Sequence, residues 1–180
     1  MKEPEIIERC KKGDRKAQRE LYDAYADRMY RVVLRYLKSN PDAEDVLQVA
    51  FTKIYAGIRD FEYREPGSAE SWIRRIVVNE ALMWLRKRHN FHMTESLEEI
   101  HEPVDLGAFS ELPGEEITKL IGQLPPGYRT VFNLYVVEGY NHAEIGGMLG
   151  VTESTSRTQL YKAKSILRKI LTQEGFQYGT

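Results

Sequence analysis

The chain has 180 residues, of which 42% are hydrophobic and 29% are charged, and its formal net charge is −1. This length suits one large or two small domains. No apolar run approaches the length of a membrane span, and residues 1–12 are too charged for a secretory signal. We therefore expect a cytoplasmic protein without membrane insertion. The single Cys10 excludes an internal disulfide framework and a multi-cysteine zinc site, and four scattered histidines lack metal-ligand spacing.

The small net charge hides a segregation of charge along the chain. Residues 1–90 carry 19 basic and 15 acidic side chains, residues 91–116 carry none and eight, and residues 117–180 carry seven and four. Two basic blocks joined by an acidic connector fit two nucleic-acid-binding modules better than one compact enzyme. No paired carboxylates, nucleophile–base set or phosphate-binding glycine loop stands out, so we expect neither enzyme activity nor a cofactor.

The first 40 residues predict two helices. A short helix over 5–12 is broken by Gly13-Asp14, and Asp14 can cap a longer helix whose apolar stripe runs from Ala17 to Tyr36. The run Ser39-Asn40-Pro41 is expected to stop that second helix.

A third helix is predicted over residues 43–61, with Asp42 as its cap. Its apolar positions share an inward face, which leaves an acidic, amide-bearing outer surface near the helix start, made of Asp42, Glu44, Asp45 and Gln48. Acidic side chains also stabilise the N-terminus of any helix, so this pattern alone does not require a partner.

A loop over Phe61–Ser68, marked by Pro66-Gly67, precedes a fourth predicted helix over residues 68–90. That helix carries apolar bulk for a core and a basic face. Two interpretations remain open. The basic residues can offset the helix dipole while Trp72 and Trp84 lie in the core, or the aromatic rings can stack on unpaired bases beside arginines that hold phosphates.

The second half begins with a predicted linker that has no lysine or arginine. Helices are then predicted over 115–123 and 128–137, interrupted by Leu124-Pro125-Pro126-Gly127. No strand pattern is present. We therefore expect an all-α fold with two small helical domains, residues 1–91 and 116–175, joined by a flexible acidic linker over 92–115.

The most specific stretch runs from Asn141 to Lys164. Ile145, Met148 and Leu149 share one helical face, Gly150 can end that helix in the left-handed conformation, and Thr152 can cap the next. Gly146 stands where a crossing second helix needs a small residue. This spacing is typical of a helix-turn-helix motif.

The second helix of this motif offers hydroxyl, guanidinium and ammonium groups on one face, which suit base edges and phosphates. These groups belong to Ser154, Arg157, Thr158, Tyr161 and Lys162. An ordinary amphipathic hairpin with a solvated basic face is the alternative interpretation.

In this order the motifs resemble the small, two-domain sigma factors of bacterial RNA polymerase, the extracytoplasmic-function (ECF) class, over roughly Ile6 to Leu171. The stretch DAEDVLQVAFTKIYAGIRDF is similar to the helix that docks on the polymerase clamp, and SAESWIRRIVVNEALMWLRKR to the helix that reads and opens the −10 element. The stretch from Leu124 to Lys164 is similar to the −35-reading domain. The resemblance implies core RNA polymerase (β′ clamp and β flap), promoter DNA and an inhibitory anti-sigma factor as partners.

The resemblance also implies roles for individual residues. Polymerase binding is expected at Asp42, Glu44, Asp45 and Gln48. Contacts to the −10 element are expected at Phe61, Tyr63, Arg64, Trp72, Arg74, Arg75 and Asn79. Contacts to the −35 element are expected at Ser154, Arg157, Thr158, Tyr161 and Lys162.

Three positions depart from the family pattern. Ser156 stands where the family usually turns a valine inward, Gln159 replaces a frequent arginine, and Ala69 sits where many relatives carry an aromatic residue near the −10 loop. Two other hypotheses remain. One is a stand-alone helix-turn-helix regulator that binds duplex DNA without polymerase, and the other is a helical scaffold that binds a protein groove.

Overall fold

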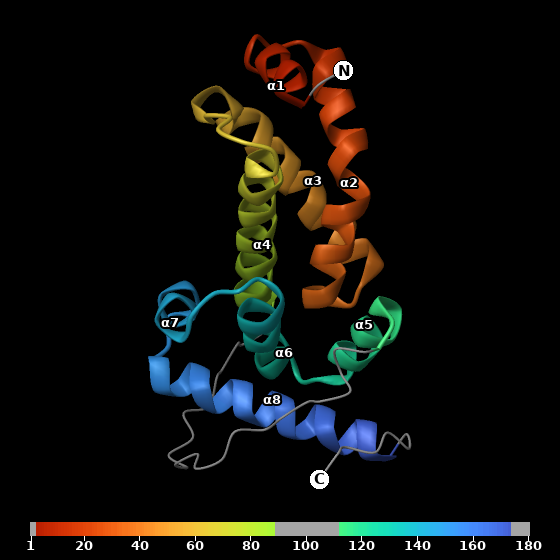
Figure 1. Ribbon diagram of the computed structural model, residues 1–180, viewed down its shortest axis with the longest axis vertical. Coiled ribbons are helices and arrows are strands. Elements are labelled where there is room, and N and C mark those ends of the chain that lie inside the picture. The colour runs from red at the N-terminus through yellow and green to blue at the C-terminus, as the bar shows by residue number, and fades with distance from the viewer. Residues whose placement is uncertain (1–2, 89–111, 174–180) are drawn as a thin grey trace. The chain divides into compact units, whose positions relative to one another are not determined.

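The computed structural model describes residues 3–88 and 112–173, and every regular element in those ranges is helical (Figure 1). The expectation of an all-α fold is therefore confirmed for the described residues. The chain divides into two units, Met1–His89 and Asn90–Thr180, here called the N-terminal and C-terminal units. The predicted linker lies largely outside the described residues, and the predicted domain limits stay predictions.

The N-terminal unit is built from α1 (Glu3–Lys11), α2 (Arg15–Leu37), α3 (Asn40–Gly57), the short 3-10 helix η1 (Ile58–Asp60) and α4 (Ser68–Arg88). The long helices α2, α3 and α4 pack against one another in pairs (Figure 1). Their apolar stripes meet in a core whose fully buried side chains include Leu21, Met29, Tyr36, Ile54, Ile73 and Leu85.

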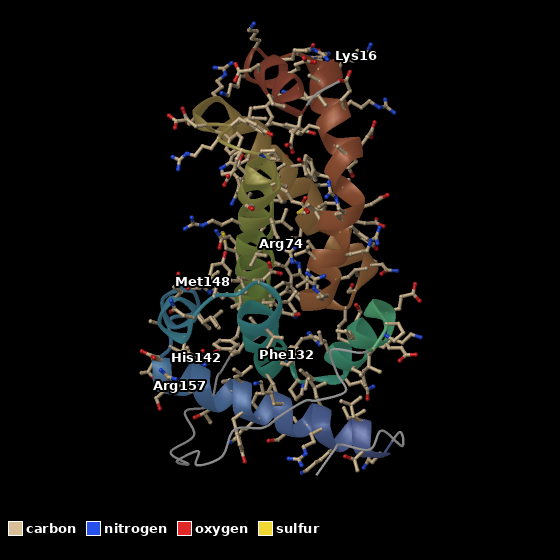
Figure 2. All side chains as sticks on the ribbon, in the orientation of Figure 1. Lys16, Arg74, Phe132, His142, Met148 and Arg157 are labelled. Atoms are coloured by element: carbon tan, nitrogen blue, oxygen red, sulfur yellow. The ribbon has the colours of Figure 1, made fainter. Side chains whose placement is uncertain are left out.

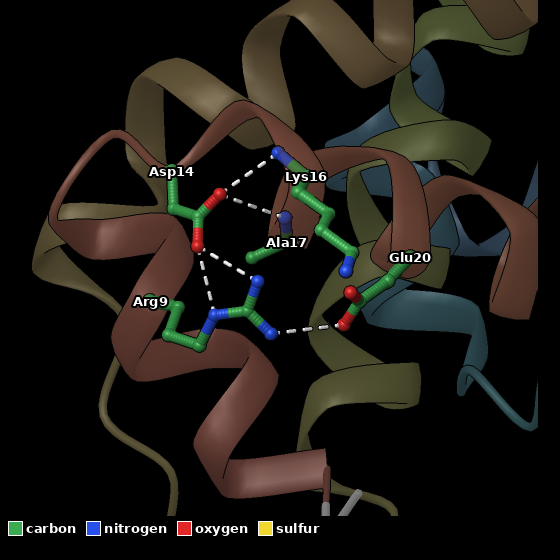
Figure 3. A network of polar contacts seen from close by, with 5 residues as sticks. All are labelled: Arg9, Asp14, Lys16, Ala17 and Glu20. Carbon is green, nitrogen blue, oxygen red and sulfur yellow. Dashed lines mark hydrogen bonds and ion pairs between the residues drawn. The ribbon is translucent and has the colours of Figure 1, made fainter.

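A polar network joins α1 to α2 (Figure 3). Asp14 is the N-cap of α2, as predicted, and its Oδ1 accepts hydrogen bonds from the backbone N–H groups of Lys16 at 2.8 Å and Ala17 at 3.2 Å. The Arg9 guanidinium donates to Asp14 Oδ2 at 2.8 Å and to Glu20 Oε2 at 3.1 Å. The hydrogen bond from Arg9 and the cap N–H groups lower the pKa of Asp14 below its usual value.

The start of α3 differs from the prediction. The helix begins at Asn40, and the N-cap is Ser39, whose Oγ accepts from the Asp42 backbone N–H at 3.4 Å. Proline is tolerated in a first helical turn because its missing N–H has no partner there, so Pro41 lies inside the first turn of α3. Helix α2 ends earlier, at Leu37, where Lys38 takes a left-handed φ of 62°. Asp42 therefore lies within the first turn, and its assignment as the cap is wrong.

The C-terminal unit contains α5 (Gly114–Gln123), α6 (Pro126–Phe132), η3 (Asn133–Val137), α7 (His142–Leu149) and α8 (Glu153–Gln173). Helices α6 and α7 both pack on α8. The element η3 is a π-helical turn that continues α6, so the helix predicted over 128–137 begins earlier and changes its hydrogen-bond pattern at its end. The core includes Ile121, Leu124, Phe132, Leu134 and Leu167.

The apolar face predicted for α7 is only partly buried. Ile145 is fully buried, whereas Met148 and Leu149, in the last turn of α7, are half-buried. Among the described helices, none is long and apolar enough to cross a membrane.

Candidate nucleic-acid interface

Local hydrogen bonds set the ends of α7 and the start of α8. Asn141 and Glu144 form a capping box: the Asn141 side chain accepts from the Glu144 backbone N–H at 2.9 Å, and the Asn141 N–H donates to Glu144 Oε2 at 2.8 Å. Gly150 ends α7 with a left-handed φ of 70°. The Thr155 backbone N–H then donates to Thr152 Oγ1 at 3.0 Å, which confirms Thr152 as a capping residue for α8.

The small residue predicted at position 146 faces the turn backbone. A Cβ added at Gly146 would lie 2.8 Å from the Val151 carbonyl oxygen and 3.6 Å from the Glu153 nitrogen. The turn therefore approaches α7 so closely that a side chain has no room. This close approach is the physical basis of the glycine in the helix-turn-helix pattern.

A buried polar contact inside the motif explains how a serine fits at position 156, where the family usually has a valine. Its side chain is fully buried, and its Oγ lies within hydrogen-bond distance, 2.9 Å, of His142 Nδ1. The Tyr135 ring stacks on the imidazole, with ring centroids 4.4 Å apart. Burial, and then the positive charge of Arg157, lower the pKa of His142. Figure 2 shows His142 and Arg157 near the junction of α7 and α8.

The predicted −35 face of α8 is exposed only in part. Ser154 and Arg157 are exposed, and Tyr161 and Lys162 are half-buried. Thr158, however, is only 4% exposed, which corrects the expectation of a continuous accessible face. Thr155, Thr158 and Gln159 stand at i, i+3 and i+4 and form a buried polar strip along α8. A search for apolar periodicity could not reveal this strip, because these residues are polar.

The outer surface of α3 carries the predicted acidic residues. Glu44, Asp45 and Gln48 are exposed, and Asp42 is half-buried. Val49, which follows Gln48, is 48% exposed, and the sequence analysis did not predict an exposed apolar residue on this face. A helical projection could have found it, since residue 49 follows Asp45 by four positions.

A hollow of about 680 Å³ lies between the loop after η1 and the start of α4. Four of the seven residues predicted to contact the −10 element line it: Phe61, Arg64, Trp72 and Arg75. The remaining lining residues include Asp60, Glu62, Glu65 and Ser71. The Phe61 and Trp72 rings stack with centroids 4.7 Å apart, so Trp72 is a half-buried side chain at the pocket rather than a wholly buried core residue.

The other three predicted residues lie outside this pocket. The Tyr63 hydroxyl donates to Glu3 Oε2 at 3.1 Å. Arg74 is half-buried on α4, and Asn79 is exposed one helical turn beyond Arg75. Ala69, where many relatives carry an aromatic residue, is 1% exposed and does not line the pocket. The aromatic rings of the pocket belong to Phe61 and Trp72.

Comparison with known proteins matches each unit to a protein family. The Sigma-70 region 2 family matches residues 21–91, and the family Sigma-70, region 4 matches residues 114–167. The ECF RNA polymerase sigma factor SigW of Bacillus subtilis is 30% identical over 178 residues, which cover 92% of this chain and 94% of SigW. SigE of Mycolicibacterium smegmatis, also an ECF RNA polymerase sigma factor, is 31% identical over 160 residues, which cover 84% of this chain and 60% of SigE.

A solved structure supports the same fold. The structure of CnrH in complex with the cytosolic domain of CnrY matches 94% of this chain and 97% of that chain, with a TM-score of 0.52 and 19% sequence identity. The two helical units, the helix-turn-helix geometry and the similar sequences all point to the same family. The chain belongs to the ECF class of the sigma-70 family of RNA polymerase sigma factors.

Proposed function

We propose that this sigma factor reads the −10 element with the pocket beside α4, reads the −35 element with α8, and binds core polymerase through the outer face of α3. As a sigma factor the chain is a transcription initiation factor that directs RNA polymerase to promoters, and it is not an enzyme. The observation that carries the residue assignment is the aromatic-walled pocket at the start of α4, inside the region that matches Sigma-70 region 2.

The composition of the pocket favours a base over a phosphate. Phe61 and Trp72 provide aromatic surface on which an unpaired base can stack, and such stacking offsets the few kcal/mol that base flipping costs. The lining also contains Asp60, Glu62 and Glu65, whose carboxylates repel phosphate but accept hydrogen bonds from exocyclic amino groups. Arginines on the same lining can hold the flanking phosphates.

The −35 assignment depends on the exposed start of α8. Arg157 has a 61% exposed side chain, and it pairs with Glu153 one turn earlier. An exposed ion pair of this kind contributes little to stability, so the guanidinium can turn to a guanine edge or a phosphate at small cost. Tyr161 and Lys162 extend this surface along the helix. Thr158 is buried, so neighbouring side chains would have to move before it could contact DNA.

The polymerase surface combines charge and apolar area. Asp45 and Gln48 flank the exposed Val49 on α3, so a partner with basic and apolar groups suits this face, and the β′ clamp is the expected partner. The β flap is expected to bind the C-terminal unit. Because both DNA-reading units would be held by one polymerase, each can be weak alone while the assembly demands both elements at the correct spacing.

An inhibitor is the remaining partner. CnrH, which shares this fold, was solved in complex with the cytosolic domain of CnrY. We expect an anti-sigma factor of this kind to bind the present chain and cover one of its polymerase-binding or DNA-binding faces. The stand-alone regulator is not favoured, because both regions of a sigma factor are present.

Run-off transcription with core polymerase and a pool of promoter fragments tests the proposal. We expect initiation from a discrete subset of fragments, and no initiation when the protein is left out. Substituting Trp72→Ala should weaken use of these promoters without weakening binding to polymerase. Tight duplex binding without initiation on any template would support the stand-alone regulator instead.

A further inference from the structure

The carboxylate of Glu3 contacts two tyrosines from different parts of the N-terminal unit. Tyr25 of α2 donates its hydroxyl to Glu3 Oε1, and Tyr63 of the loop after η1 donates to Glu3 Oε2 at 3.1 Å. Burial and then the adjacent Glu3 carboxylate raise the pKa of both phenols above the ordinary tyrosine value, which favours the protonated form that donates the hydrogen bond. Glu3 thus links α1 to α2 and to the loop.

The same network reaches the start of α4. The Arg28 guanidinium lies over the Tyr25 ring, 5.0 Å from its centroid, and its Nη1 is 2.7 Å from Glu70 Oε2. Glu70 is in the first turn of α4, two residues before Trp72 of the pocket. The contacts of Glu3 and Arg28 therefore connect both sides of the pocket, its loop and its helix.

Residues 61–64 have no regular secondary structure, so side-chain contacts hold the loop. Phe61 stacks on Trp72 and Ser68 Oγ accepts from the backbone N–H groups of Arg64 and Glu65, while Tyr63 bonds to Glu3. Phe61 and Arg64 line the pocket, while Tyr63 does not line it and bonds to Glu3. A loop that is ordered before its ligand arrives binds more tightly, because it loses less conformational entropy when the ligand binds. Helix α1 lies before residue 21, where the match to Sigma-70 region 2 begins, so the family comparison assigns it no role.

We propose that Glu3 is a positioning residue for the −10 pocket, and that it acts by holding Tyr63 so that the loop over 60–68 is ordered before DNA binds. This inference rests on the proposed function of the pocket. Tyr63, which the sequence suggested as a direct DNA contact, then contributes to promoter recognition through its bond to Glu3. Tyr25 orients the carboxylate from the opposite side.

Hydrogen exchange on the full-length chain tests the structural half. Glu3→Ala should raise exchange in peptides covering residues 60–68 about tenfold, the effect expected from losing hydrogen bonds to a charged group, and leave α7 and α8 unchanged. Glu5→Ala is the matched control, because Glu5 is exposed on the same helix. Tyr63→Phe keeps the ring and removes only the donor, so it repeats the test if Glu3→Ala loosens the whole helix. Unchanged loop exchange in both variants would overturn the proposal.

The functional half uses core polymerase with each variant and a single-stranded oligonucleotide carrying a −10 element that the wild type recognises. Glu3→Ala and Tyr63→Phe should each weaken binding about five- to tenfold, and the double variant should be no weaker than either. Polymerase binding should change less than about twofold. Multiplying effects would show that Tyr63 acts independently of Glu3 and would refute the coupling. If the wild type selects no promoter, the proposed function fails, while the exchange experiment still decides whether Glu3 orders the loop.

Discussion

Two adjacent glycines in α7 allow a direct test of the turn geometry. A Cβ at Gly146 would lie 2.8 Å from the Val151 carbonyl oxygen, which is about 0.6 Å closer than an ordinary contact, and the obstructing atom belongs to the backbone of a tight turn. A Cβ at Gly147 meets nothing within 4 Å. The two positions share a helix and differ in the space beside them.

The expected energies follow from this difference. Replacing glycine with alanine inside a helix stabilises it by up to about 1 kcal/mol, and Gly147→Ala should gain much of that. Gly146→Ala gains the same propensity but forces the turn to move, and overpacking of this kind costs about 1–3 kcal/mol. We therefore expect Gly146→Ala to be less stable than Gly147→Ala by about 1–3 kcal/mol in the C-terminal unit.

Native-state hydrogen exchange of the full-length chain at increasing urea concentrations measures this difference. Peptides from α7 and α8 report the C-terminal unit, and peptides from α2 and α3 serve as an internal control that should not change. Equal stability of the two variants would refute the reasoning, because it would mean that the turn shifts without cost and that the close approach at Gly146 does not select glycine.

Three further predictions concern the outer face of α3, which we propose binds polymerase, and the buried Ser156–His142 pair. Asp45→Arg should abolish co-purification with core polymerase while the circular dichroism spectrum stays unchanged, because Asp45 is exposed on α3; Asp27→Arg on the exposed side of α2 is the charge-matched control, and retained co-purification would exclude this face. Ser156→Ala should destabilise the C-terminal unit by about 1–3 kcal/mol in the same exchange assay, since it removes a partner of the buried His142 ring. Burial lowers the pKa of His142, so the unfolded state takes up the proton first. The contribution of neutral His142 to the stability of the unit should be fully present above about pH 6.5 and be lost progressively as the pH falls below that value, and His142→Asn should flatten this slope.

Patterns that act over a few residues could be predicted from the sequence. The cap at Asp14, the left-handed Gly150 and the cap at Thr152 all depend on sterics and hydrogen bonds within one or two helical turns. For the same reason the all-α class and the helix-turn-helix motif followed from spacing alone. The error at Asp42 is also local: Ser39 and Asp42 are both good capping residues, and the choice between them depended on Pro41 fitting the first turn.

Accessibility along a predicted face required the tertiary structure. Helical spacing placed Thr158 on the same polar face of α8 as Arg157 and Lys162, and the burial of Thr158 became visible only in the folded chain. Val49 shows the opposite case, an apolar residue left exposed on α3 among polar neighbours. Hydrophobic patterns describe what a helix can bury, whereas actual burial depends on what packs against each face.

Two long-range polar contacts, one in each unit, also could not be predicted from the sequence. Ser156 meets His142 across 14 positions, and Tyr63 meets Glu3 across 60. Neither residue type predicts its partner, because serine, histidine, tyrosine and glutamate can all be satisfied by water on a surface. Sequence patterns were enough to predict most helices, the helix-turn-helix motif and the family. Which polar groups meet depended on how the helices pack, since a hydrogen bond forms at contact distance however far apart its partners lie along the chain.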